Sequence, residues 1–207
     1  MNIRQALTDG RLILSASPTP ELDARLLLQH ILQATHSYLI AHDDEQLTAV
    51  QIQQYRATLQ RAVAKEPIPY ILGHAPFYDL EFLVTPDVLI PRPETEQLVQ
   101  IALSWANGRG PIRIVDVGTG SGCIAITLAR HLPQAAVQAT DISLAALSIA
   151  RQNAVRLAPN RVQFHHGSLL EPINRPIDLL VANLPYVTDG EWTMLDDGVK
   201  LYEPQVA

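Results

Sequence analysis

The sequence predicts an α/β protein with a mostly parallel sheet, preceded by a small helical domain and a β-hairpin linker. Between residues 112 and 183, short apolar runs alternate with segments of helical periodicity, and strands that alternate with helices form parallel sheets with right-handed crossovers. Residues 1–75 show helical periodicity without strand patterns. We therefore expect a helical recognition domain at 1–75, the linker at 76–92 and the α/β domain at 93–207.

Composition is that of an ordinary globular protein. The 207 residues are 47% hydrophobic and 17% charged, which is enough apolar mass for one full domain and a smaller one. The formal net charge of -6 provides no overall basic field, so no direct nucleic-acid partner is expected. With one cysteine, no secretory pattern and no apolar run approaching about 18 residues, we expect a cytoplasmic protein that does not span a membrane.

The helical domain is expected to contain two main helices. The first begins with Thr19 as its cap, Pro20 in the first helical position and Glu21 near the positive end of the helix dipole. The second begins at about Thr48, after which apolar residues recur every three or four positions. Six basic residues stand against seven acidic ones over residues 1–75, a near-neutral balance that suits protein recognition better than phosphate binding.

The linker contains two further patterns. Two prolines make Glu66–Tyr70 a stiff connection, and Phe77–Val84 alternates like a strand that can pair with Val88–Ile90 around a Thr-Pro-Asp turn. The segment Pro91–Glu96 then begins a helix, and helix initiation accounts for its proline and glutamates. It does not account for Arg92, which stands between two prolines and is therefore a candidate for binding a substrate.

The α/β domain has a glycine-rich turn after its first strand. The expected strands are 112–117, 137–140, 162–165 and 177–181, and the expected helices are 124–131 and 144–156. In Asp116-Val-Gly-Thr-Gly-Ser-Gly122, Gly118 and Gly120 allow a sharp turn, while Gly122 allows the next helix to pack closely on the sheet. The spacing is tighter than in the dinucleotide fingerprint, which favours an amino-acid-bearing ligand over a pyrophosphate.

A carboxylate ends the second strand. Asp141 follows the glycine turn by about 20 residues, where an acid can bind both hydroxyls of a ribose; it can also cap the helix that follows. The turn and the acid together predict a nucleoside ligand, and S-adenosylmethionine (SAM) is the one expected without a pyrophosphate loop. Leu169, at the next strand end, can cover an adenine ring. Cys123, His165 and His166 are interpreted as structural, and no metal site is expected.

The last strand ends at Asn183-Leu-Pro-Tyr186, which can bind a planar N–H2 group. The Asn183 side-chain carbonyl can accept one N–H, and the Leu184 backbone carbonyl, held outward by Pro185, can accept the other. Tyr186 offers a ring face for stacking. A nitrogen held in this way can attack an electrophile such as the SAM methyl group. A strand end followed by an ordinary turn is the alternative interpretation.

In these motifs the chain resembles the release factor glutamine methyltransferases, the PrmC/HemK family. The resemblance runs to Tyr202-Glu-Pro204 and is most specific at Pro76-Phe-Tyr and Leu89-Ile-Pro-Arg-Pro-Glu-Thr-Glu96. It implies a Rossmann-like enzyme that transfers a methyl group from SAM and leaves S-adenosylhomocysteine. The acceptor would be the side-chain amide nitrogen (N5) of the glutamine in the Gly-Gly-Gln motif of class I peptide chain release factors. The N-terminal helices would dock the release factor.

The resemblance also implies roles for individual residues. The cofactor contacts would be Gly118, Thr119, Gly120, Ser121, Gly122, Asp141, Leu169 and Asn183. The glutamine would be held by Asn183, Leu184, Pro185 and Tyr186, of which the first, third and fourth are the candidate catalytic residues.

Two departures from the family pattern keep other hypotheses open. Leu184 stands where the family usually has proline, and Asn-Leu-Pro-Tyr is also typical of rRNA adenine dimethyltransferases. Family members continue past Glu203-Pro204 with further strands, so a C-terminally truncated form with an unprotected sheet edge is expected. The alternatives are an adenine-N6 methyltransferase acting on RNA or DNA, and a truncated module that binds release factors without catalysis. The acidic composition weighs against the first.

Overall fold

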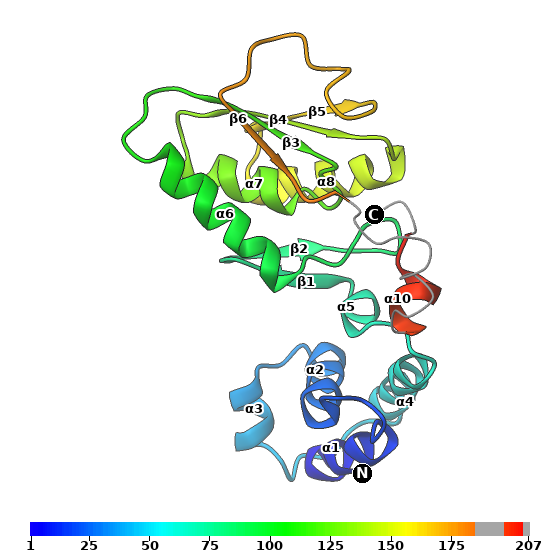
Figure 1. Cartoon of the computed structure of the whole chain (residues 1–207). Coiled ribbons are helices and arrows are strands. Elements are labelled where there is room, and N and C mark those ends of the chain that lie inside the picture. The colour runs from blue at the N-terminus through cyan, green and yellow to red at the C-terminus, as the bar shows by residue number, and fades with distance from the viewer. Residues whose placement is uncertain (185–196, 205–207) are drawn as a thin grey trace. The chain divides into compact units, whose positions relative to one another are not determined.

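The structure is a computed structural model that describes residues 1–184 and 197–204 (Figure 1). The chain divides after Leu72 into a helical unit, which also includes residues 197–201, and an α/β unit. The helical unit contains α1 (Ile3–Ile13), α2 (Pro20–Leu32), α3 (His36–Ala41), α4 (Ala49–Val63), α5 (Ile68–Leu72) and most of α10 (Asp197–Tyr202). No helix in the described ranges is long and apolar enough to cross a membrane.

The two predicted helices of the helical unit are confirmed as α2 and α4. Thr48 caps α4 in a capping box with Gln51. Thr19 precedes α2 as predicted, but its hydroxyl donates to Asp23 Oδ1 (3.1 Å) instead of accepting a main-chain N–H of the helix. The core of the unit encloses Tyr55, whose hydroxyl donates to the carbonyl of Ala24 (3.1 Å).

The stiff connection predicted at Glu66–Tyr70 is wrong, because helix α5 occupies most of it. The carbonyl of Pro67 accepts from the main-chain N–H groups of Tyr70 and Ile71 (3.0 and 3.2 Å). Pro69 is the second residue of this short helix, where no N–H is needed for an intrahelical bond. Prolines that look like breakers in the sequence are therefore compatible with a first helical turn.

The predicted hairpin between Phe77–Val84 and Val88–Ile90 is also wrong. The hairpin instead joins β1 (His74–Phe77) to β2 (Leu80–Leu83), with Tyr78 at φ 58° in a two-residue turn. Val88 and Ile90 are buried but belong to no strand.

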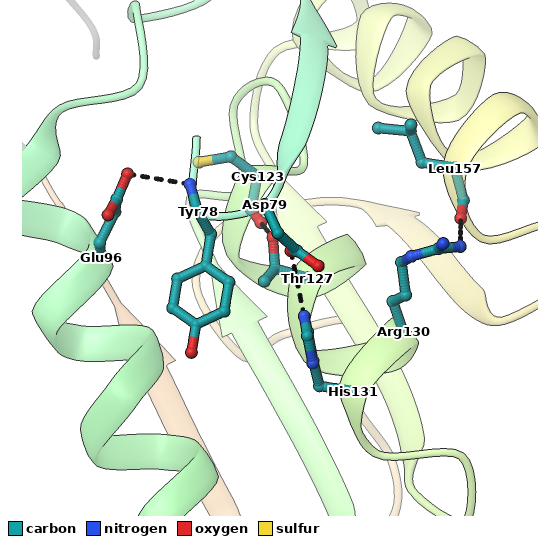
Figure 2. A network of polar contacts seen from close by, with 8 residues as sticks. All are labelled: Tyr78, Asp79, Glu96, Cys123, Thr127, Arg130, His131 and Leu157. Carbon is teal, nitrogen blue, oxygen red and sulfur yellow. Dashed lines mark hydrogen bonds and ion pairs between the residues drawn. The ribbon is translucent and has the colours of Figure 1, made fainter. Parts of the chain in front are cut away.

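Three contacts fix the turn of this hairpin on the helices of the α/β unit (Figure 2). The Tyr78 main-chain N–H donates to Glu96 Oε1 of α6 (2.9 Å), and the Tyr78 ring meets the His131 ring of α7 edge-on. Asp79 pairs with His131 Nε2 (3.1 Å), and this contact lowers the pKa of the Asp79 carboxyl. The hairpin is therefore anchored to both helices at its tip.

The predicted parallel sheet is confirmed, with strand order β5-β4-β3-β6. Its elements are α6 (Pro93–Ala106), β3 (Arg113–Val117), α7 (Cys123–His131), β4 (Ala136–Asp141), α8 (Leu144–Leu157), β5 (Val162–His166) and β6 (Leu179–Ala182). In Figure 1 the three helices lie on the face of the sheet toward the hairpin. From β3 the chain moves to β4 and β5 on one side, and β6 returns to the other, so the carboxyl edge beside β3 is a topological switch point.

The burial of β6 on both faces, expected from its apolar run, is not observed. Leu180 is 46% exposed, whereas Val181 is buried. Within the described residues β6 pairs only with β3 and is the edge strand of the sheet.

Candidate active site

A cavity of about 360 Å³ lies at the carboxyl edge of the sheet. Its walls include the glycine turn, the ends of β4 and β6, and the start of α6. Most of the residues predicted for cofactor and substrate line it, namely Gly118, Thr119, Gly120, Ser121, Asp141, Leu169, Asn183, Leu184 and Arg92. Gly122 does not line it, and Pro185 and Tyr186 lie outside the described residues.

The glycine turn has the backbone geometry expected of it. Gly118, Gly120 and Gly122 have φ of 70°, 54° and 83°, a left-handed region that favours glycine. The carbonyl of Thr140 at the end of β4 accepts from the main-chain N–H groups of Gly118 and Thr119 (2.9 and 3.0 Å). A Cβ at Gly120 would meet no atom within 4 Å. The backbone at that position can therefore be approached closely by a ligand.

Gly122 differs from its sequence interpretation. A Cβ there would lie 2.8 Å from Ile126 Cδ1 in the same helix and 3.3 Å from Ala150 Cβ in α8. The close approach that glycine permits is therefore to the neighbouring helix α8, whereas packing on the sheet had been expected.

Asp141 joins the glycine turn to the next helix. Its Oδ2 accepts from the Gly120 N–H (2.9 Å) and its Oδ1 from the Ser143 N–H (2.9 Å). The cap of α8 is Ser143, whose hydroxyl accepts from the Ala146 N–H (3.1 Å). Asp141 lines the cavity, and each carboxylate oxygen keeps acceptor capacity beyond its one internal bond. Donors such as ribose hydroxyls match this remaining capacity.

Two exposed apolar side chains stand beside Asp141 in the cavity wall. Leu169 is 55% exposed, and its carbonyl accepts from the Thr140 hydroxyl (2.8 Å), which holds the residue at φ 47°. Ile142 is 56% exposed and was not singled out from the sequence, although it directly follows Asp141. An acceptor carboxylate between apolar surfaces fits a nucleoside, which has a polar sugar and an apolar base.

The end of β6 lies beside the glycine turn because of the sheet register. Val117 pairs with Ala182, so Gly118 and Asn183 follow at the same edge. A Cβ on Gly118 would lie only 2.8 Å from Leu184 Cδ2. The Leu184 side chain therefore lies against the turn and contributes a contact as well as a backbone carbonyl. Asn183 Nδ2 donates to the hydroxyl of Thr95 (3.2 Å).

Comparison with known proteins identifies the family. The model for the PrmC N-terminal domain matches residues 5–73, and that for the methyltransferase small domain matches residues 100–199. The release factor glutamine methyltransferase of Koribacter versatilis is 42% identical over all of this chain and 75% of its own length. The chain belongs to the release factor glutamine methyltransferase family. The Bordetella pertussis member is 43% identical over 91% of this chain and 70% of its own.

Among solved structures, the ribosomal protein L11 methylase of Lactobacillus delbrueckii subsp. bulgaricus is 34% identical, with a TM-score of 0.41 over 45% of this chain and 47% of that one. As a member of the release factor glutamine methyltransferase family, the chain is a SAM-dependent methyltransferase. The acceptor carboxylate of Asp141 and the apolar side chains of Leu169 and Ile142 fit the nucleoside part of that cofactor.

Arg92 makes a contact that the sequence did not reveal. It is the N-cap residue of α6, and its Nη2 lies 2.6 Å from Glu203 Oε1. The Glu203 side chain is only 2% exposed, and burial raises its pKa while Arg92 opposes that shift. The stiff Pro-Arg-Pro segment of this methyltransferase therefore holds an ion pair at the cavity wall. Contact of Arg92 with a substrate stays a prediction.

Asp116, directly before the glycine turn, is a second residue to which the sequence assigned no role. It is fully buried, and its Oδ2 accepts from the Thr119 hydroxyl (2.6 Å) and the Ala125 N–H (3.2 Å), while its Oδ1 has no partner. Burial raises the pKa of its carboxyl to about 6. Burial also raises the pKa of the Cys123 thiol to about 12, so the thiol stays protonated and suits the structural role predicted for it.

The histidines at the end of β5 have protein partners. His166 Nε2 lies 3.0 Å from the carbonyl of Ile142, and His165 Nε2 lies 3.2 Å from Gln138 Nε2. Within residues 1–184 and 197–204, no group of three or more His, Cys, Asp or Glu side chains could hold a metal ion.

Proposed function

We propose that this protein methylates N5 of the glutamine in the Gly-Gly-Gln motif of class I peptide chain release factors, in the cytoplasm. Membership of the release factor glutamine methyltransferase family is the main support. The observation that supports it most within the structure is the pairing of Val117 with Ala182. Because of this register, a turn suited to SAM and an amide acceptor suited to glutamine adjoin the same cavity.

The residues at the end of β6 would orient the glutamine amide. An amide nitrogen is a weak nucleophile because its lone pair is delocalised, so accepting both of its N–H groups directs that lone pair and contributes most of the catalysis. We assign one acceptor to Asn183 Oδ1 and the other to the Leu184 carbonyl. Pro185 would restrict Leu184 to an extended backbone, and Tyr186 would stack on the amide plane.

When bound, SAM would supply the electrophilic methyl group, and the bond from the glutamine nitrogen to that carbon would form as the S–C bond breaks with its electron pair left on sulfur. The cofactor would be held by the glycine turn, Asp141 and Leu169. Of the described residues lining the cavity, the ionisable ones are Asp87, Arg92, Cys123 and Asp141. None is assigned as a general base, because the methylated amide loses its extra proton to water.

The helical unit would dock the release factor. It exposes large apolar side chains at Leu12, Ile13, Ile40, Val50 and Val63, while its sequence is nearly neutral. Exposed apolar side chains with little net charge suit contact with a protein better than contact with nucleic acid.

The test is transfer of labelled methyl from SAM to a purified bacterial release factor. The matched control is the same release factor with its Gly-Gly-Gln glutamine changed to alanine. We expect label on the first and none on the second, with the modified residue located by mass spectrometry. Equal labelling of both would refute the assigned site, and no labelling despite measurable SAM binding would refute the assigned substrate.

A further inference from the structure

Two contacts anchor the first turn of α6. Arg92, which caps the helix, is paired with buried Glu203 (2.6 Å), and Glu96 accepts from the Tyr78 N–H of the hairpin turn (2.9 Å; Figure 2). Thr95 lies between these two anchors and lines the cavity with only 8% of its surface exposed. The backbone that carries the Thr95 hydroxyl is therefore anchored by contacts that do not involve the end of β6.

A hydrogen bond joins the Thr95 hydroxyl to Asn183, which directly follows β6. Asn183 Nδ2 donates to Thr95 Oγ1 (3.2 Å) across 88 residues of sequence. The side-chain amide of asparagine has a donor end and an acceptor end of nearly the same shape, and its orientation is set by hydrogen-bond partners. With Nδ2 bonded to Thr95, Oδ1 is the end left to accept from another group.

We propose that Thr95 is a positioning residue that keeps the Asn183 oxygen directed at the substrate N–H2 group. The proposal rests on the proposed function, in which Asn183 Oδ1 accepts an N–H of the glutamine. If the amide turned over, Asn183 would present its own N–H2 to the substrate N–H2, and donor would face donor. In the observed orientation Thr95 Oγ1 accepts the Nδ2 hydrogen bond, in a half-buried place where an unpaired donor is unfavourable. A substrate N–H2 group on the other side of the amide selects the same orientation, because of the two amide ends only Oδ1 can accept from it.

The experiment compares Thr95→Val, which removes the hydroxyl at similar size, with Thr95→Ser, which keeps it. Methyl transfer to a release factor is measured together with SAM affinity and the melting temperature. We expect Thr95→Val to lower kcat roughly ten- to a hundred-fold, as for one half-buried donor left unpaired, with the SAM Kd within about three-fold. Thr95→Ser should keep at least about a third of wild-type kcat. If Thr95→Val does not fold, Thr95→Ala is used with the same expectations.

A double-mutant cycle separates positioning from a general structural role. Because Thr95 acts through Asn183, adding Thr95→Val to Asn183→Ala should lower kcat no further than about two-fold. The proposal would be overturned if Thr95→Val lowered kcat as much in the Asn183→Ala background as it does in wild type. It would also be overturned if the single variant Thr95→Val kept wild-type kcat. If wild type itself transfers no methyl to the release factor, the proposed function fails and the positioning role fails with it. An active wild type with an insensitive Thr95→Val refutes the positioning role alone.

Discussion

Asn153 of α8 connects the glycine turn to the hairpin, and its removal should destabilise the α/β unit. The side chain is fully buried. Its Nδ2 donates to the carbonyls of Ser121 (2.9 Å) and Leu83 (3.0 Å), and its Oδ1 accepts from the Leu83 N–H (2.7 Å). One side chain therefore satisfies three main-chain groups, two on β2 and one in the turn.

The expected cost of Asn153→Ala follows from those three groups. Each buried main-chain group left without a partner costs about 1–3 kcal/mol, but Leu83 is only partly buried and water can reach part of it. The better helix propensity of alanine returns about 0.5 kcal/mol. We expect a net loss of about 3 kcal/mol in the free energy of unfolding. SAM affinity should fall as well, because the Ser121 carbonyl belongs to the turn that lines the cavity.

The assay is urea unfolding followed by tryptophan fluorescence, since both tryptophans of the sequence come after residue 73 and Trp105 lies on α6. The matched control is Gln152→Ala, an exposed neighbour on the same helix whose side chain donates to the Ser148 carbonyl of that helix (3.4 Å). The control should stay within about 0.5 kcal/mol of wild type. A loss below about 1 kcal/mol in Asn153→Ala would refute this account of the connection.

Three further predictions concern stability and the turn. Because the pKa of buried Asp116 is raised to about 6, the folded state binds its proton more tightly than the unfolded state. Its contribution to the free energy of unfolding should therefore fall by roughly 3 kcal/mol as pH rises from about 3 to 7. Asp116→Asn should remove that slope in urea titrations, and an unchanged slope would contradict the assignment. Gly10→Ala should cost roughly 2 kcal/mol in thermal melts followed by circular dichroism, since its Cβ would lie 2.1 Å from the Tyr55 hydroxyl oxygen. Tyr55→Phe in the same chain should relieve part of this cost. If the stability losses of Gly10→Ala and Tyr55→Phe simply add in the double variant, the clash is not the cause. Gly122→Ala should lower the melting temperature more than Gly120→Ala, since only the former meets neighbouring atoms. Calorimetric titration should show that Gly120→Ala weakens SAM binding, and unchanged affinity would mean that the ligand does not approach that backbone.

Local patterns made the sheet and part of the site predictable. The glycines after β3 and Asp141 at the end of β4 each lie next to a strand end, where sequence and position can be read together. The true hairpin was missed because Tyr78 adopts the left-handed region without glycine or asparagine to signal it. The Thr-Pro-Asp sequence nearby is a stronger turn signal, but it does not join two strands.

The contacts that organise the site were not predictable from local sequence. Asn183 meets Thr95 across 88 residues, Arg92 meets Glu203 across 111, and Asn153 meets Leu83 across 70. Each partner has an ordinary local explanation, such as helix initiation or an exposed polar face, and its role emerges only when the fold brings the pair together. The Pro-Arg-Pro-Glu-Thr-Glu segment was thus recognised as unusual without its hydrogen-bond partners being identifiable.

The central claim is that the Asn183 side-chain oxygen orients a glutamine amide for methyl transfer. The most direct test measures the initial rate of transfer to a release factor by wild type and by Asn183→Ala, with the SAM Kd of each measured in parallel. We expect the rate to fall by at least about a hundred-fold, as for loss of an oriented catalytic contact, while the SAM Kd changes by less than about ten-fold. Near-normal turnover by Asn183→Ala on the same glutamine would contradict the mechanism.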